Sequence, residues 1–289
     1  MDGRPVVAIT GANGYLGGVC CDAFAGAGYE VRRLVRRPEF GRGDRGFSLD
    51  GGCDAGALDG VDVLIHCAYD FAPRSRRGIW SANVVGTRAL LDAARAASVR
   101  RVILISSMSA YAGTRQLYGR AKLASELDAV AIGATVVRPG LVYGPRWGGT
   151  VGSLRTLASL PIVPLVGGRT HQFTVHEDDL ASGLLAVAES APPSVPIGLA
   201  HPTPVPFRAL LTEIGHSATG RSPRFFPIPW RALYAVMRLG EVLHLPLPLR
   251  ADSLLGLVRP APTVPNPEVL ADLGVTVRPF SLDEFRTAD

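Results

Sequence analysis

The chain has 289 residues, of which 47% are apolar and 19% charged, and a formal net charge of +5. This composition is that of a globular protein and excludes a disordered one, and the length predicts one large domain or two unequal lobes. No apolar run approaches the roughly 18 residues that a membrane span needs, and the first residues lack the features of a signal peptide. We therefore expect a cytoplasmic protein with no membrane partner.

The cysteine and basic residues indicate neither disulfides nor nucleic-acid binding. The four cysteines form no Cys-x-x-Cys pair, and we expect no metal site. Lys122 is the only Lys among the 30 basic residues. The arginines are scattered and lack the interleaved aromatic residues of a nucleic-acid surface. In a chain that almost never uses Lys, Lys122 is a candidate for chemistry.

The first two-thirds of the chain alternates strand-like and helix-like segments. Strands are predicted at 5–10, 29–35, 61–67, 101–106 and 134–138, and helices at 15–27, 79–97 and 118–132. The segments 61–67 and 101–106 are continuously apolar, which is typical of strands that are buried on both faces of a parallel sheet. Repeated strand–helix units predict an α/β fold with a doubly wound parallel sheet, the Rossmann arrangement.

After about residue 145 the pattern loosens and proline becomes frequent. A strand at 171–176 and a helix at 178–189 are expected to rejoin the sheet. The predicted domains are therefore a nucleotide-binding domain at 1–147, rejoined by 171–199, and a smaller C-terminal substrate-binding lobe at 148–170 and 200–289. The segment 229–245 is compatible with an amphipathic membrane helix or with a helix of this lobe, and we favour the lobe helix.

Three glycines, Gly11, Gly14 and Gly17, lie between the first predicted strand and the first predicted helix. There the chain turns tightly, a pyrophosphate can approach the backbone, and the helix start offers free N–H groups. Any strand–helix turn can use glycine, but this context favours a dinucleotide site. The second strand ends with no acid and with Arg36 and Arg37, which favours the 2′-phosphate of NADP over the free ribose of NAD.

Tyr118 and Lys122 lie four residues apart at the start of a predicted helix, which places the phenol and the ammonium on one face. A nearby cation stabilises a phenolate, so we expect Lys122 to lower the pKa of Tyr118 from its usual value of about 10. Serines at 106–109 follow a buried strand, at the carboxyl edge of the sheet where ligands bind. A hydroxyl at this place can hydrogen-bond a substrate carbonyl.

Together, these segments resemble the short-chain dehydrogenase/reductase superfamily, in its extended branch of epimerase/dehydratase-like proteins. The ordered set of matches is specific for this family, although no single piece is. In chain order the matching segments are TGANGYLG (10–17), GVDVLIHCA (60–68), NVVGT (83–87), SSMSAY (106–111), YGRAK (118–122), RPGLVYGP (138–145) and HEDDLA (176–181).

The resemblance implies roles for particular residues. Tyr118 would act as the acid–base, and Lys122 would bind the nicotinamide ribose. Ser107 would polarise the carbonyl, and it is preferred over Ser106 because the family's serine lies four residues before the position of Tyr111. Asn83 would hold a water or brace the site. Cofactor contacts are expected at Gly11, Asn13, Gly14, Tyr15, Leu16, Gly17, Arg36, Arg37, Cys67, Ala68, Tyr118, Lys122, Pro139, Leu141 and Val142.

Two positions separate the reactions that similar proteins catalyse. The family's dehydratases carry an Asp-Glu pair after the active-site Ser or Thr, whereas Met108 and Ser109 follow Ser107. Its epimerases carry Asn where this chain has Leu141. We therefore expect an NADP(H)-dependent reductase of a ketone or aldehyde on a small, apolar substrate. The alternatives are a sugar-nucleotide epimerase or sugar ketoreductase, and a non-catalytic NADP-binding regulator. The family's usual homodimer is a further expectation.

Two departures from the family pattern affect the site. Ser107 and Tyr118 are only 11 residues apart, so the connection over the substrate is short. The segment 47–60 is rich in Gly and Asp and is compressed, which leaves the contacts to the adenine open.

Overall fold

The computed structural model describes residues 3–39, 43–167, 170–243 and 251–283. Within these residues eight strands form one sheet, and the strands are parallel to their neighbours except at the β3–β4 edge. In spatial order they are β12 (Ile197–Leu199), β7 (Thr135–Pro139), β6 (Arg101–Ile105), β5 (Val63–His66), β1 (Val6–Thr10), β2 (Glu30–Val35), β3 (Arg45–Ser48) and β4 (Gly52–Cys53). The predicted doubly wound α/β fold is confirmed.

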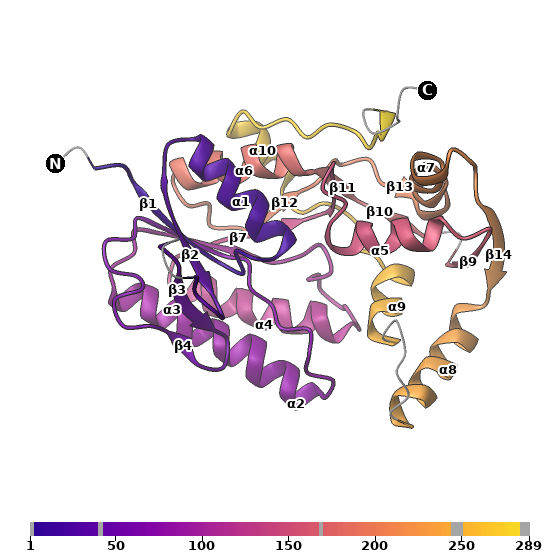
Figure 1. The fold of residues 1–289 in the computed structure, drawn as a ribbon, viewed down its shortest axis with the longest axis horizontal. Helices are drawn as coiled ribbons and strands as arrows, with labels where there is room; N and C mark the ends of the chain where they lie inside the picture. The colour runs from indigo at the N-terminus through magenta and orange to yellow at the C-terminus, as the bar shows by residue number, and fades with distance from the viewer. Residues whose placement is uncertain (1–2, 40–42, 168–169, 244–250, 284–289) are drawn as a thin grey trace.

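Helices cover both faces of this sheet, as Figure 1 shows. Successive side chains of a strand point to opposite faces. Val7 and Ile9 of β1 therefore pack into one core, while Ala8 between them packs into the other. The first core is covered by α1 (Tyr15–Gly26), α6 (Glu177–Glu189) and α10 (Pro267–Asp272), and the second by α3 (Gly86–Ala96) and α4 (Leu117–Ala131). Burial from both sides explains the continuous apolar runs.

The helix predicted at 79–97 is divided into three parts. It starts as α2 (Arg76–Ile79), widens into a π-helical turn at Trp80–Val85, and continues as α3. The residues of such a turn are displaced relative to an α-helix, and π-helical turns are frequent at functional sites. The turn contains Asn83, whose side chain is buried.

The prediction of a strand at 171–176 that rejoins the sheet is wrong. This segment forms two short strands, β10 (His171–Gln172) and β11 (Thr174–His176), which pair with β13 (Val205–Pro206) and β8 (Leu141–Tyr143) outside the main sheet. The place beside β7 is taken by β12, so the chain rejoins the sheet through α6 and β12 instead. In the compressed segment, sequence reasoning also missed β3 and β4.

The remaining segments form the C-terminal lobe. Its elements are α5 (Gly149–Ala158), β9 (Ile162–Val166), α7 (Phe207–Thr219), β14 (Arg224–Ile228), α8 (Trp230–Val242) and α9 (Ala251–Val258). The segment predicted as a helix at 229–245 forms α8, in which Met237 is buried in one cluster with Leu254 of α9, and residues 244–245 lie outside the described part. In the described residues we find no helix with the length and hydropathy that crossing a bilayer requires.

Candidate active site

The turn between β1 and α1 leaves backbone N–H groups free for an anion. Gly14 N donates to the Gly11 carbonyl at 2.8 Å, which closes the turn. A Cβ at Gly17 would overlap with that carbonyl, so only glycine allows α1 to start this close to the turn. Within the described residues, no side chain caps the start of α1 and no acid lies in its first turn. This arrangement fits the pyrophosphate of a dinucleotide.

Two predicted cofactor residues on this turn are engaged with the protein itself. Asn13 Oδ1 accepts a hydrogen bond from the guanidinium of Arg33. The Tyr15 hydroxyl donates to Glu177 Oε2 at 2.8 Å, and Arg146 lies 3.3 Å from the same carboxylate. Burial, followed by the hydrogen bond to Glu177, raises the pKa of Tyr15. Tyr15 therefore joins the glycine-rich turn to the start of α6. Its hydroxyl proton is engaged in the hydrogen bond to Glu177.

Arg33 of β2 contacts the same turn, and Arg36 and Arg37 directly follow this strand. Arg36 and Arg37, predicted to hold a 2′-phosphate, are exposed directly after β2. A hydrogen bond from Ser48 is the main cause that lowers the pKa of Asp50, and the charge of Arg36 adds to it. Sequence reasoning missed Arg33, which contacts Asn13, because no signal distinguishes it within the Arg-rich segment.

The structure separates Ser106 from Ser107. Ser106 is buried, and its hydroxyl donates to Glu126 Oε1. Arg138 binds the same carboxylate with two N–H groups at 2.9 and 2.5 Å. The Ser107 hydroxyl instead accepts the N–H of Ser109 at 3.1 Å, and it lies close enough to Tyr118 to lower the pKa of that phenol. Of the two serines, Ser107 is therefore the one in contact with Tyr118.

Tyr118 lies among aromatic rings that the sequence analysis did not select. Its ring packs edge-on against Tyr69, with ring centres 4.8 Å apart, and stacks on Phe71 at 5.9 Å. Tyr69 and Phe71 lie in the loop after β5, just beyond the matching segment that ends at Ala68. Two aromatic residues immediately after the segment 60–68, which matches the family, were the sequence signal that could have indicated them. These rings give Tyr118 an apolar surrounding.

The expected lowering of the Tyr118 pKa is wrong, because the net shift has the opposite direction. Burial raises the pKa of Tyr118 above its ordinary value, and the hydrogen bond with Ser107 only partly opposes this. Lys122 Nζ donates to the Ile105 carbonyl at 2.7 Å and lies 5.2 Å from the ring centre of Tyr69. Burial also lowers the pKa of Lys122 to about 8. The spacing places both residues in α4 as expected, but desolvation is the largest cause that shifts either pKa.

Asn83 occupies a bracing position. Its Oδ1 accepts the N–H of Asp70 at 2.7 Å, and its Nδ2 donates to the carbonyls of Asp70 at 3.0 Å and Ile79 at 3.2 Å. The π-helical turn thus holds the loop after β5, which carries Tyr69 and Phe71.

The other predicted cofactor residues lie at the carboxyl ends of β5 and β7. Ala68 N donates to Thr10 Oγ1 at 3.1 Å, and Cys67 Sγ lies 3.9 Å from Cys20 Sγ. The Pro139 carbonyl accepts the N–H of Met108 at 3.1 Å. Leu141 and Val142 follow in β8. These two hydrogen bonds join the segment after β5 to the end of β1, and the segment after β6 to the end of β7.

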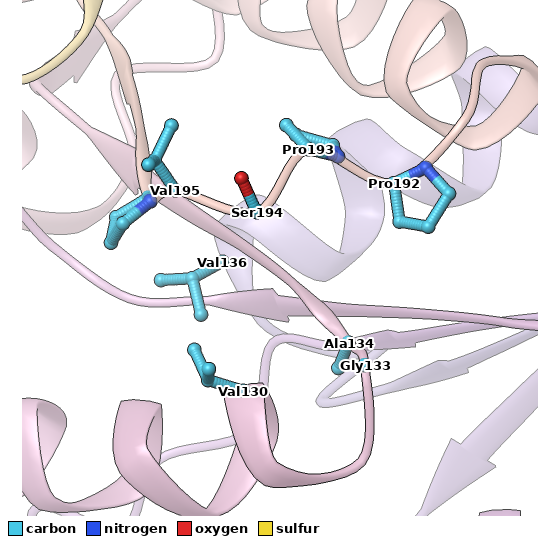
Figure 2. A pocket seen from close by; sticks show the side chains of 9 residues that line it. Val130, Gly133, Ala134, Val136, Pro192, Pro193, Ser194 and Val195 are labelled. Atoms are coloured by element: carbon cyan, nitrogen blue, oxygen red, sulfur yellow. The ribbon is translucent and has the colours of Figure 1, made fainter.

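Figure 2 shows a hollow elsewhere, walled by Val130 and Val136 on one side and by 192–196 on the other. β7 and β12 begin beside it, so it lies at the amino-terminal edge of the sheet. Because ligands of such sheets bind at the carboxyl edge, this hollow is separate from the candidate active site.

Comparison with known proteins assigns the family. The model of the NAD dependent epimerase/dehydratase family matches residues 7–198. The chain belongs to this family.

Two curated relatives of this epimerase/dehydratase family member are reductases by name. The chain is 37% identical over 203 residues to a ceramide reductase from Caulobacter vibrioides, and the match covers 64% of this chain but only 61% of that protein's length. It is 29% identical over 274 residues to a 4-hydroxy-2-methyl-3-oxo-4-farnesyl-3,4-dihydroquinoline-1-oxide ketoreductase from Stigmatella aurantiaca, with 81% and 79% of the two chains covered.

A solved structure shares the whole architecture. MoeE5 in complex with UDP-glucose and NAD has a TM-score of 0.73 at 20% identity, and the match covers 99% of this chain and 97% of that one. At this identity the likeness shows the fold. As an epimerase/dehydratase family member the chain is expected to bind a nicotinamide dinucleotide, and the free N–H groups of α1 and the glycines of the turn before it fit one.

Proposed function

We propose that the protein is an NADP(H)-dependent oxidoreductase that reduces a ketone or aldehyde on an apolar substrate to an alcohol. The observation that carries this proposal is the position of Ser107, which follows β6 at the carboxyl edge of the sheet and acts on the pKa of Tyr118 at the start of α4. Two hydroxyls that meet there can serve one carbonyl oxygen, one as a hydrogen-bond donor and the other as a proton donor. The reductase names of two relatives support the same reaction class.

Each residue of the site has a distinct task in this reaction. When bound, the dinucleotide supplies a hydride to the carbonyl carbon. Ser107 donates a hydrogen bond to the oxygen as it gains negative charge, and Tyr118 transfers its phenolic proton to it. A phenol with the ordinary pKa of about 10 is protonated at neutral pH, so Tyr118 carries the proton that it donates. Lys122 presents its ammonium one helical turn away, where it favours the phenolate that remains.

Apolar residues stand at the two positions that separate the family's reactions. Met108 packs against the cluster of Phe173, Ala200 and Val264, and Leu141 packs against the core of the C-terminal lobe. Neither supplies the acid of a dehydratase or the amide of an epimerase. By their names, two relatives act on ceramide and on a farnesyl-bearing ketone, which supports a lipid-like substrate.

The cofactor preference rests on the end of β2. Arg36 and Arg37 are exposed there. The strand end therefore lacks the acidic residue that would bind the ribose hydroxyls of NAD. A guanidinium pairs well with a phosphate, so NADPH is the proposed reductant.

A cofactor-consumption screen tests the proposed function. The purified protein is mixed with NADPH or NADH and with panels of long-chain keto lipids, short ketones, aldehydes and sugar nucleotides. We expect oxidation of NADPH in step with alcohol formation, and the fastest turnover on the long-chain ketones. Interconversion of a sugar nucleotide without net oxidation of the cofactor would instead show an epimerase, because an epimerase returns its hydride to the same substrate.

A further inference from the structure

The helix that carries Tyr118 is capped by a residue from another part of the chain. Its own N-cap residue, Gln116, makes no capping hydrogen bond through its side chain. Instead, Leu117 N donates to Asp252 Oδ1 at 2.6 Å, and Tyr118 N donates to Asp252 Oδ2 at 3.2 Å. Asp252 lies in α9, more than 130 residues further along the chain. One carboxylate therefore accepts the first two N–H groups of α4.

The same face of α9 and the residue just beyond it hold the loop that precedes Tyr118. Gly256 lies one turn after Asp252, and a Cβ there would come within 2.7 Å of the Gln116 side chain. Arg259 follows α9, and its carbonyl accepts the hydroxyl of Tyr111 at 3.0 Å. Positions 252, 256 and 259 have the spacing of one helical face. Figure 1 shows α9 between α4 and α8.

These contacts act on a short connection. Ser107 and Tyr118 are only 11 positions apart in the chain, so a displacement at the start of α4 moves the phenol relative to the serine. The first N–H groups of a helix need acceptors, and a carboxylate there also interacts favourably with the positive end of the helix dipole. Asp252 meets both needs from a helix of the substrate lobe.

We propose that Asp252 is a positioning residue, which holds Tyr118 beside Ser107 by capping α4 from the C-terminal lobe. The proposal rests on the proposed reductase function for its kinetic consequence. Its structural part, the protection of the start of α4, is independent of any substrate. Nothing in the residues around Tyr118 in sequence indicates Asp252, because the contact is purely tertiary.

The experiment compares Asp252→Asn and Asp252→Ala with wild type and with Glu268→Gln and Glu268→Ala. Glu268 is an exposed acid in the first turn of α10, and it is the matched control. Asp252→Asn keeps one side-chain oxygen and so guards against a variant that fails to fold. We measure kcat for ketone reduction, the solvent deuterium isotope effect, the dissociation constant of NADPH, and hydrogen exchange of peptides across 111–125.

We expect Asp252→Ala to lower kcat by about 10- to 100-fold, because small misplacements of a reacting group cost this much. Asp252→Asn should be intermediate. The solvent isotope effect should rise, since proton transfer from a displaced Tyr118 becomes slower, while NADPH affinity stays within about twofold. A purely structural role would reduce the number of NADPH sites and leave the isotope effect unchanged. Exchange should increase in 111–125 and stay unchanged in the peptide of the β1–α1 turn.

Unchanged kcat with folded Asp252→Ala would overturn the proposal, and so would unchanged exchange at the start of α4. If the wild type reduces no carbonyl, the proposed function fails on its own. The exchange measurement then decides whether Asp252 holds the start of α4, with increased exchange supporting the placement and equal exchange refuting it.

Discussion

Asn83 and Asp70 are joined by two hydrogen bonds that run in opposite directions between one side chain and one backbone. Asn83 Oδ1 accepts the Asp70 N–H at 2.7 Å, and Asn83 Nδ2 donates to the Asp70 carbonyl at 3.0 Å. The pair fastens the loop after β5 to the π-helical turn. This loop brings Tyr69 against Tyr118, so Asn83 acts on the site through the loop.

Replacing Asn83 should therefore affect both stability and turnover. Asn83→Asp loses the donor and places a carboxylate next to the carbonyls of Asp70 and Ile79. We expect a loss of about 1–3 kcal/mol in the free energy of unfolding, measured by urea titration, because buried partners lose their hydrogen bonds. The value of kcat should fall about tenfold or more as the loop is released. Asn266→Asp, the same chemical change at a remote Asn that donates to the Pro196 carbonyl, should leave kcat unchanged.

Substitutions of Tyr118, Ser107 and Ser106 should have different effects on the reaction rate and on stability. Tyr118→Phe removes the proton donor and should slow single-turnover NADPH oxidation about 100- to 10,000-fold with the cofactor affinity preserved. Ser107→Ala should slow the same step. Ser106→Ala should act mainly on stability, because it removes a partner of the buried Glu126. If Tyr118→Phe kept more than about a tenth of the rate, Tyr118 would not be the proton donor.

The cofactor preference should depend on Arg36. We expect tighter binding of NADPH than of NADH by roughly 10- to 100-fold, the value of one good charge-assisted contact of about 1.5–3 kcal/mol. Arg36→Ala should remove most of this preference and leave NADH binding little changed, as measured by fluorescence titration. Arg95→Ala is the control, since Arg95 is an exposed residue of α3 paired with Asp92. Equal affinity of the wild type for both cofactors would rule out the assignment.

Lys122 allows a direct measurement of its pKa. Because it is the only Lys, incorporation of ¹³C-lysine labels one side chain, and its Cε resonance can be followed with pH. We expect a midpoint near pH 8 in the protein without cofactor, because burial lowers the pKa of Lys122 to about 8. A midpoint above pH 10 would mean that the ammonium is solvated.

His66 should make stability depend on pH. Its ring lies between the hydroxyls of Thr10 at 2.7 Å and Thr87 at 2.9 Å, and burial lowers its pKa to about 3, with a contribution from the charge of Lys122. Between pH 6.5 and 3 the unfolded chain binds a proton that the folded chain excludes, so stability falls as the pH falls. From pH 7.5 to 5.5 the loss from this residue is about 1.4 kcal/mol.

Urea unfolding of the wild type and of His66→Asn at both pH values isolates this contribution. Carboxylates titrate equally in both proteins, so the difference between the two pH dependences reports on His66. Identical pH dependences would show that His66 does not lose its charge on folding.

The local patterns of the sequence predicted much of the fold. The apolar runs 61–67 and 101–106 indicated buried parallel strands, and they form β5 and β6. Hydrophobic alternation and the glycine spacing are properties of neighbouring residues, so they can be read without the structure. The division of 79–97 was not visible, since the π-helical turn is stabilised by Asn83 contacts to a loop that precedes it.

The candidate site divides in the same way. The sequence by itself determined the glycine-rich turn, the four-residue spacing of Tyr118 and Lys122, and the absence of an acid after Ser107, because each depends on residue type and spacing alone. Only the tertiary structure decided that Ser106 binds Glu126 while Ser107 meets Tyr118, that aromatic rings surround the phenol, and that Asp252 caps α4. It also reversed the expected shift of the Tyr118 pKa. Burial and contacts between distant segments set these properties, and both arise only when the chain packs.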